Sequence, residues 1–244
     1  MKVLAVIPAR LASTRLPRKV LLPIAGQSML AHVYLGVRAA SELADVIVAT
    51  DSQEILDLCR QRGWRAQLTS ASCRNGTERV QEVSQAIAAD VYINVQGDEV
   101  LARPEHIRSL IELMKDPAIP VGTLKTPCAP GEINYPHAVK VVADAAGRAL
   151  YFSRATIPYD RDGVAPRYYK HLGFYAYRKA ALDRYVALPE SELERSERLE
   201  QLRFLENGIP IHVAETAFDT LRVDTEEDLR RAEQLLAKAG ANRR

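Results

Sequence analysis

Short apolar segments rich in valine and isoleucine alternate with segments of helical periodicity in the first half of this chain. The apolar segments predict strands at residues 3–9, 45–50 and 91–96, and the periodic segments predict helices at residues 29–40, 53–62, 77–89 and 104–114. Because the strand segments are apolar throughout, helices must cover both faces of the sheet. The pattern predicts a Rossmann-like α/β fold with a mostly parallel central sheet.

The pattern changes after Val121. Closely spaced strand candidates follow, separated by glycine, proline and charged residues, at 138–144, 149–156 and 172–178. This spacing predicts a smaller antiparallel lobe at about residues 125–178, within a single domain of residues 1–244. One helix is predicted at residues 191–206. Another is predicted from Glu226 to the end of the chain, where Thr225 and Asp228 have the spacing of a capping box.

Composition narrows the class of protein. Hydrophobic residues make up 47% of the chain and charged residues 26%, as in ordinary globular proteins, and the formal net charge is only +2. So small a charge argues against nucleic-acid partners. Cys59, Cys73 and Cys128 are odd in number and form no CxxC pair, so neither a zinc site nor a disulfide framework is predicted. Since no apolar segment approaches the roughly 20 residues of a membrane span, we expect a cytoplasmic protein without membrane insertion.

A cationic loop follows the first predicted strand. Residues 8–19 contain Arg10, Arg15, Arg18 and Lys19 together with two hydroxyl side chains. Ligands of open α/β sheets bind at the carboxyl ends of strands, and guanidinium groups match pairs of phosphate oxygens. The loop therefore predicts binding of a nucleoside triphosphate. The Gly-x-Gly-x-x-Gly fingerprint of dinucleotide sites does not open the first helix, which disfavours hydride transfer.

Two aspartates are candidates for holding a metal ion beside that triphosphate. Asp98 follows the predicted strand at 91–96, and Asp224 directly precedes the last helix. Mg²⁺ is usually held by one or two carboxylates together with phosphate oxygens and water. Local sequence leaves other readings open: Asp98 begins a turn with Glu99 in solvent, and Asp224 serves as an anion at a helix N-terminus.

Residues 74–79 form a turn that leads into a helix. The helix start, where Thr77 stands, and the nearby Arg79 are candidates for binding ribose or phosphate. A capped surface helix explains the same residues equally well.

Aromatic residues mix with arginine and histidine in three segments, 150–154, 159–162 and 171–178. A sugar acid suits such surroundings, because its hydroxyls need polar partners and its carboxylate pairs with a guanidinium. Aromatic cross-strand pairs in a half-buried sheet produce a similar pattern.

With these residues in view, the chain resembles the 3-deoxy-manno-octulosonate cytidylyltransferases. Nine motifs occur in the family's order and cover nearly the whole chain: IPARLASTRLPRK, IVATD, NGTERV, INVQGDE, VKVV, ALYFSRATIPYDRD, HLGFYAYR, LEQLR and VDTEEDL. The resemblance implies a nucleotidyltransferase-type α/β fold, a homodimer and dependence on Mg²⁺. It also implies transfer of CMP from CTP to 3-deoxy-D-manno-octulosonate (Kdo), with release of pyrophosphate, for lipopolysaccharide biosynthesis.

The same resemblance implies roles for individual residues. Arg10 and Lys19 match positions that hold the triphosphate, and Gln96 lies where the family contacts the nucleotide. Asp98 and Asp224 match the family's magnesium-binding aspartates. The stretches that line the family's sugar pocket contain Arg154, Arg161, His171, Tyr175, Glu200 and Gln201.

Several positions depart from the family pattern. Val100 replaces the proline of GDEP, Tyr159 replaces a tryptophan, and Arg222 stands where glycine is common before VDT. These departures leave open the transfer of CMP to a related acidic sugar, such as an 8-amino analogue of Kdo or a sialic acid. A nucleotide-binding module without turnover is the alternative from a different class, and pyrophosphate release separates the two.

Overall fold

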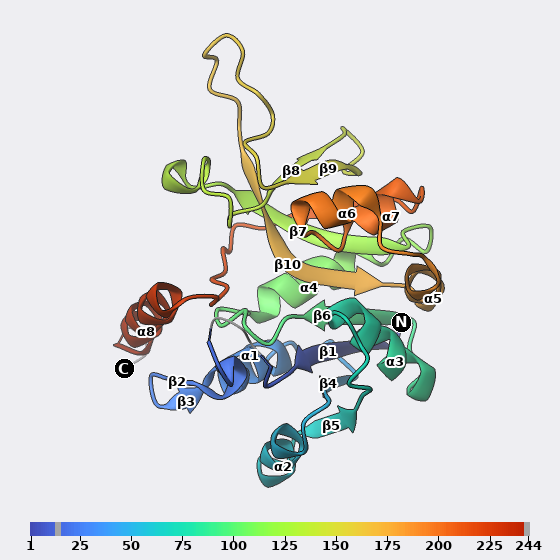
Figure 1. Ribbon diagram of the computed structural model, residues 1–244, viewed down its shortest axis with the longest axis vertical. Coiled ribbons are helices and arrows are strands. Elements are labelled where there is room, and N and C mark those ends of the chain that lie inside the picture. The colour runs from blue at the N-terminus through green and yellow to red at the C-terminus, as the bar shows by residue number, and fades with distance from the viewer. Residues whose placement is uncertain (13–15, 242–244) are drawn as a thin grey trace.

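The computed structural model describes residues 1–12 and 16–241, which build a nine-stranded sheet with helices on both faces (Figure 1). The strand order is β11-β7-β10-β6-β1-β4-β5, and β8 and β9 branch from β10. A separate hairpin is formed by β2 (Pro23–Ile24) and β3 (Gln27–Ser28). The strands of the large sheet are β1 (Val3–Ala9), β4 (Asp45–Thr50), β5 (Arg65–Leu68), β6 (Val91–Val95), β7 (Val121–Pro127), β8 (Lys140–Ala143), β9 (Ala149–Ser153), β10 (Tyr169–Tyr177) and β11 (Ile211–Glu215).

The sheet is mostly parallel, which confirms the predicted fold class. Strand β1 pairs in parallel with β4 and β6, β4 pairs in parallel with β5, and β11 pairs in parallel with β7. Of the seven described strands in the main order, all but β10 therefore run in the same direction. The predicted antiparallel strands are also present: β10 runs antiparallel to β6, β7 and β8, and β8 runs antiparallel to β9. Strand β10 lies inside the main sheet, between β6 and β7, so the antiparallel region is continuous with the parallel one.

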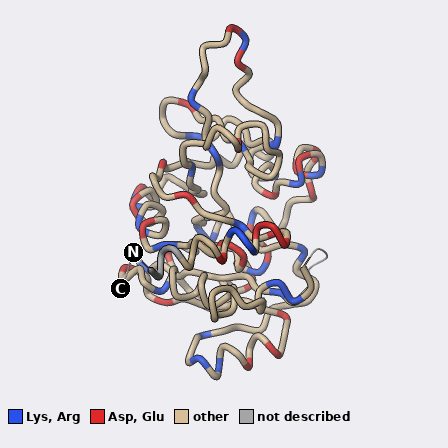
Figure 2. The backbone as a smooth tube through the Cα atoms, turned by 90° about the vertical axis from the view of Figure 1, so that its left-hand side faces the viewer, with Lys and Arg blue, Asp and Glu red and all other residues tan. Residues whose placement is uncertain are grey.

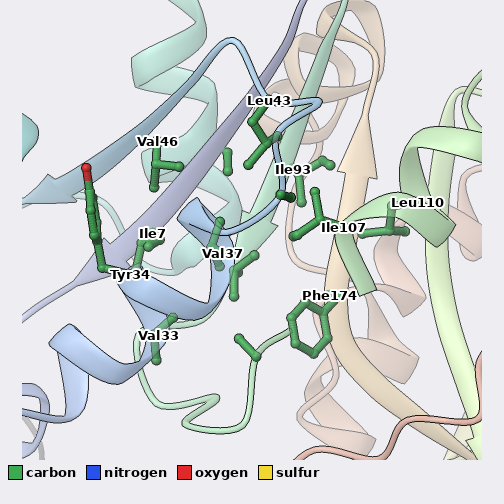
Figure 3. Packing of buried hydrophobic residues seen from close by; sticks show 14 of the residues in the cluster. Ile7, Val33, Tyr34, Val37, Leu43, Val46, Ile93, Ile107, Leu110 and Phe174 are labelled. Atoms are coloured by element: carbon green, nitrogen blue, oxygen red, sulfur yellow. The ribbon is translucent and has the colours of Figure 1, made fainter. Parts of the chain in front are cut away.

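Two apolar clusters cover the two faces of the sheet, because successive side chains of a strand point to opposite sides. In β1, Val3, Ala5 and Ile7 join one cluster, and Leu4 and Val6 join the other. The first cluster packs against α1 (Met29–Arg38), α2 (Gln53–Gln61) and α4 (Pro104–Leu113), and part of it is shown in Figure 3. The second packs against α3 (Gly76–Ala86), α5 (Lys179–Ala187) and α7 (Leu202–Glu206).

Local side-chain caps set where several helices begin. Ser28, Ser52 and Asn75 each accept a hydrogen bond from a backbone N–H three residues later, at the starts of α1, α2 and α3. The capping box predicted before α8 (Glu226–Ala241) is confirmed: Asp228 N donates to Thr225 Oγ1 at 3.1 Å, and Thr225 N donates to Asp228 Oδ2 at 2.9 Å.

The prediction of a single helix at residues 191–206 is wrong. Two short helices replace it, α6 (Glu192–Glu197) and α7, with Arg198 between them in a left-handed conformation at φ 54°. That residue ends α6 and redirects the chain, so that both Leu199 and Leu202 enter the second apolar cluster. The apolar spacing of this segment followed a helical period, but the redirected chain buries the same residues without a continuous helix.

Two segments extend from the sheet. Helix α8 lies at one side of the molecule and packs on β2 through a third apolar cluster that includes Ile24, Val223 and Ala232. The connection between β9 and β10 projects as a long loop (Figure 1). Basic and acidic segments are interspersed along the chain in Figure 2, in keeping with the small net charge. Within the part of the chain that the structure describes, none of the helices combines the length and apolar character needed to cross a bilayer.

Candidate functional site

A cavity of about 510 Å³ opens at the carboxyl ends of β1 and β6. Gly97 permits the close approach of these ends, because a Cβ at this position would lie 2.9 Å from the carbonyl oxygen of Pro8. The cavity is lined by Pro8, Ala9, Arg10, Ala12, Lys19, Val20, Cys73, Arg74, Asn75, Gly76, Arg79, Gln96, Gly97, Asp98, Glu200, Arg222 and Asp224. The cationic loop and both candidate metal ligands therefore meet in one place, although Arg15 lies outside the described residues.

Asp98 and Asp224, here called the acidic pair, approach each other through a shared lysine. Lys19 Nζ lies 2.5 Å from Asp98 Oδ2 and 3.0 Å from Asp224 Oδ1. Lys19 begins a short 3-10 helix, η1 (Lys19–Leu21), and Asp98 follows β6. The segment that carries Asp224 is held beside Asp98 by the backbone, because Val223 N donates to Asp98 O at 3.1 Å. Asp224 thus faces the cavity, and the capping oxygen comes from Thr225.

The acidic pair fits a small divalent cation. Asp98 Oδ1 is buried, and among the described residues it has no hydrogen-bond partner, so this oxygen can accept a cation. The described residues hold no cluster of three or more His, Cys, Asp or Glu side chains arranged for a metal. Two carboxylates with room for phosphate and water are the donor set that Mg²⁺ accepts, whereas structural zinc requires four protein ligands.

Arg222 is a charged cavity residue that the sequence did not single out as functional. Its Nε lies 3.4 Å from Asp98 Oδ2 and 3.3 Å from Asp224 Oδ2. These carboxylates raise the pKa of the Arg222 guanidinium further, with Asp98 the larger cause. The signal available in the sequence was the departure from the family's glycine two residues before Asp224.

Glu99 is not in solvent, as one reading of the QGDE segment held. Its side chain is buried and accepts a hydrogen bond from Thr220 Oγ1 at 2.9 Å. Burial raises the pKa of Glu99 to about 7, and the neighbouring Asp98 adds to the shift. Gly173 makes room for this carboxyl group, since a Cβ there would lie 2.5 Å from Glu99 Oε1.

The start of α3 forms another wall of the cavity. Arg79 is almost fully buried, and its guanidinium is held by Asp51 Oδ2 at 2.5 Å and Thr69 Oγ1 at 2.6 Å. Gly76 packs on the side chain of Gln96, because a Cβ at this glycine would lie 2.7 Å from Gln96 Nε2. The start of α3 and the residue that follows β6 are thereby packed against each other.

Glu200 is the candidate sugar residue that lines the cavity. Thr77 Oγ1 donates to Glu200 Oε2 at 3.0 Å, and burial raises the pKa of the Glu200 carboxyl group. Three aromatic rings of β10 pack together: Tyr175 is stacked on Tyr177 at 5.8 Å and tilted against His171 at 5.3 Å, measured between ring centroids.

The remaining candidate sugar residues do not line the cavity. Gln201 is buried next to Glu200, and Arg154 donates from Nε to the backbone oxygen of Glu197 at 2.7 Å. Arg161 lies in the projecting loop between β9 and β10, with 87% of its side chain exposed. The structure therefore groups the candidate triphosphate and metal residues more tightly than the candidate sugar residues.

His171 leads to a prediction about stability and pH. Burial lowers the pKa of His171 to about 3, from an ordinary value near 6.5. Between pH 6.5 and 3, His171 is protonated in the unfolded chain but stays neutral in the folded protein. The free energy of unfolding therefore falls as the pH drops through this range. Between pH 6.5 and 4.5 this one group is expected to cost about 2 kcal/mol of unfolding free energy.

The variant His171→Phe isolates this contribution, since its neighbours Phe152 and Tyr175 are aromatic. Urea unfolding at pH 6.5 and 4.5 should show a pH-dependent loss that is smaller in the variant than in the original protein. Equal losses in the two proteins would contradict a buried neutral imidazole.

Comparisons with known proteins agree with this geometry. A family model described as cytidylyltransferase matches residues 4–216. A 3-deoxy-manno-octulosonate cytidylyltransferase from Koribacter versatilis is 64% identical over 236 residues, which cover 96% of this chain and 90% of the relative. The Escherichia coli protein of the same name is 43% identical, with 97% of each chain covered.

Solved structures show the same fold. A CMP:2-keto-3-deoxy-manno-octonic acid synthetase complexed with CTP superposes with a TM-score of 0.93 at 43% identity, covering 98% of this chain and all of the other. A putative glucose-1-phosphate thymidylyltransferase from Bacillus anthracis shares the fold, with a TM-score of 0.69 at 16% identity. The chain belongs to the cytidylyltransferase family and, within it, to the 3-deoxy-manno-octulosonate cytidylyltransferases.

Proposed function

We propose that this protein transfers CMP from CTP to the anomeric hydroxyl of Kdo and releases pyrophosphate, producing activated Kdo for lipopolysaccharide biosynthesis. The observation that carries the proposal is the cavity at the carboxyl ends of β1 and β6, where the cationic loop meets the acidic pair. A solved synthetase that is 43% identical to this chain and is complexed with CTP supports the proposal.

The triphosphate is assigned to the cationic loop. Arg10 and Lys19 line the cavity and would bind the phosphates, together with Arg15 of the same loop. Arg10 and Lys19 would also stabilise the charge that develops on the departing pyrophosphate. Lys19 is well suited to this role, because its contacts with the acidic pair fix its ammonium group at the edge of the cavity.

The nucleoside is assigned to the wall formed by α3 and the end of β6. Gln96 and Arg79 line the cavity, and Thr77 stands at the start of α3. Backbone N–H groups at a helix start favour anionic and hydroxyl oxygens. Because Asp51 and Thr69 hold the Arg79 guanidinium, this residue would bind a ligand with little loss of side-chain freedom.

Mg²⁺ is the proposed cofactor, held by Asp98 and Asp224. When bound, it supplies positive charge that polarises the α-phosphate and helps to orient the attacking hydroxyl. The buried Asp98 Oδ1 supports the assignment, since an acceptor without a partner in the described part of the chain is left for a cation. In the reaction the anomeric hydroxyl loses its proton to solvent, a bond forms between the anomeric oxygen and the α-phosphorus, and the bond from that phosphorus to pyrophosphate breaks.

Kdo is assigned to the side of the cavity nearest Glu200. Glu200 would accept hydrogen bonds from sugar hydroxyls, and His171, Tyr175 and Gln201 would support that wall from the buried layer behind it. We assign the sugar carboxylate to Arg154, which directly follows β9, and to Arg161 of the projecting loop, although neither residue lines the cavity in this structure. Residues 125–178 would thereby complete the sugar site and provide contacts of a homodimer.

A cytoplasmic location is part of the proposal. Cys59, Cys73 and Cys128 are free thiols, which suits a reducing compartment that also supplies CTP.

Pyrophosphate release tests the proposed function directly. With CTP, Mg²⁺ and Kdo present, we expect release at more than about 1 s⁻¹, within the usual range of enzymes, and little release when Kdo is omitted. Parallel reactions with the 8-amino analogue and with N-acetylneuraminic acid measure sugar choice, and reactions with ATP, GTP and UTP measure base choice. Absence of release with every sugar would contradict the proposal and favour a nucleotide-binding module.

A further inference from the structure

Arg222 is placed beside the acidic pair by the backbone as well as by its own side chain. Glu99 and Arg222 form an isolated antiparallel β-bridge, and Val100 N donates to Leu221 O at 3.2 Å. The guanidinium then contacts both members of the pair, at 3.4 Å from Asp98 and 3.3 Å from Asp224. Because the backbone on both sides of this contact is hydrogen-bonded, the fold itself fixes the position of Arg222 at the cavity.

The two cations that contact the acidic pair differ in how firmly they are held. Lys19 has 12% of its side chain exposed and approaches the carboxylates to 2.5 and 3.0 Å. Arg222 has 56% of its side chain exposed, and both of its contacts are longer. Exposed ion pairs are weak because water screens them. Arg222 is therefore the cation that an incoming ligand displaces more easily.

The balance of charges in the cavity indicates which ligands displace Arg222. Lys19 and Arg222 carry two positive charges, and the acidic pair carries two negative charges. These four side chains together are therefore neutral. A divalent cation that binds alone adds two positive charges beside Lys19, Arg222 and the nearby Arg10. A triphosphate that binds together with the cation removes this excess, and its oxygens also provide partners for a guanidinium.

We propose that Arg222 couples the binding of the divalent cation to the binding of the triphosphate. In the empty cavity Arg222 occupies the acidic pair and weakens cation binding, and when both ligands are present its guanidinium moves to phosphate oxygens. The inference rests on the proposed function, because it takes a divalent cation and a nucleoside triphosphate as the ligands of this cavity. By linkage, each ligand raises the affinity for the other by the same factor.

The test measures each ligand alone, with Mn²⁺ as the cation. Affinity for Mn²⁺ without nucleotide is measured from the electron paramagnetic resonance of free Mn²⁺, and affinity for CTP is measured by calorimetry in excess EDTA. In Arg222→Ala we expect Mn²⁺ to bind about tenfold more tightly and metal-free CTP about tenfold more weakly, as is typical of coupled sites. Arg222→Lys keeps the charge and should stay within about threefold of the original protein for both ligands.

Arg65→Ala is the matched control. Arg65 is 55% exposed and pairs with Asp45 at 2.7 Å, at the amino end of β4 and away from the cavity. Neither affinity should change in this variant. Arg222→Gln serves as a second neutral variant with the same expectation as Arg222→Ala, and thermal melting confirms that each variant is folded.

Tighter Mn²⁺ binding together with weaker binding of metal-free CTP in the neutral variants, with neither change in Arg222→Lys or Arg65→Ala, would support the coupling role. A purely structural role does not predict a gain in cation affinity. Unchanged or weaker Mn²⁺ binding, or unchanged affinity for metal-free CTP, in the neutral variants would overturn the inference. These titrations contain no sugar and need no turnover, so they test the coupling role independently of the reaction. Failure of the reaction with CTP and Kdo would reject the proposed function but would not decide the coupling role.

Discussion

Replacement of Asp98 by asparagine is expected to lower the kcat for pyrophosphate release by at least about a thousandfold, or about 4 kcal/mol of transition-state stabilisation. The substitution removes one of the two negative charges that hold Mg²⁺ in the proposed reaction. It also removes the closer carboxylate partner of Lys19, whose Nζ lies 2.5 Å from Asp98 Oδ2. Two groups that act on the triphosphate therefore lose their position together.

The shape of the side chain is preserved, so the fold should survive. Asp98 holds the segment before α8 through its backbone oxygen, which accepts from Val223 N, and this bond does not depend on the side chain. Pyrophosphate release and thermal melting are measured on the same preparation. Asp45→Asn is the control: it breaks an ion pair with Arg65 at the amino end of β4, and kcat should stay within about twofold. Turnover by Asp98→Asn at the original rate would reject the metal-holding role.

Replacement of Arg203 by alanine is expected to lower the free energy of unfolding by about 3–5 kcal/mol. Arg203 is 2% exposed and forms a two-pronged ion pair with Glu194, at 2.6 Å from Nε and 2.7 Å from Nη2. Its guanidinium also lies 4.2 Å from the ring centroid of Tyr185. Alanine leaves the Glu194 carboxylate buried without its partner, and this uncompensated charge accounts for most of the loss.

Urea unfolding measures the effect, with two further variants to identify its cause. Arg195→Ala removes an exposed arginine of α6 and should change the unfolding free energy by less than about 0.5 kcal/mol. The double variant Glu194→Leu with Arg203→Met replaces the whole pair by apolar side chains and should recover most of the loss. An unfolding midpoint for Arg203→Ala equal to that of the original protein would show that the pair contributes little. Because the pair joins α6 to α7, it also maintains the turn that presents Glu200.

Elements with a strong local signal could be predicted closely from the sequence. The continuous apolar runs of β1 and β4 match their predicted bounds, because both faces of these strands are buried and no polar residue interrupts them. The capping box of α8 likewise depends on residues three apart. Strand β5 (Arg65–Leu68) was missed, since an edge strand of mixed polarity has little apolar pattern.

Some residues of the candidate site could also be recognised from local sequence, whereas others depended on distant contacts. The cationic loop and Asp98 were recognisable, because each directly follows a buried strand and the carboxyl ends of parallel strands meet at one edge of a sheet. Asp224 was ambiguous by local sequence, which favoured a role at the helix N-terminus over metal binding. Its contact with Lys19 joins residues 205 positions apart, and local pattern carries no information about a contact over that distance.

The sequence by itself determined the α/β class, the strands that carry the nucleotide loop and, through its motifs, the family. These features follow from the spacing of apolar residues and from short runs whose chemistry is local. Only the tertiary structure decided that β10 enters the main sheet between β6 and β7, that Glu99 is buried, and that Arg222 contacts both carboxylates of the acidic pair. These outcomes depend on strand order and on contacts between distant segments, which the packing of the whole chain selects.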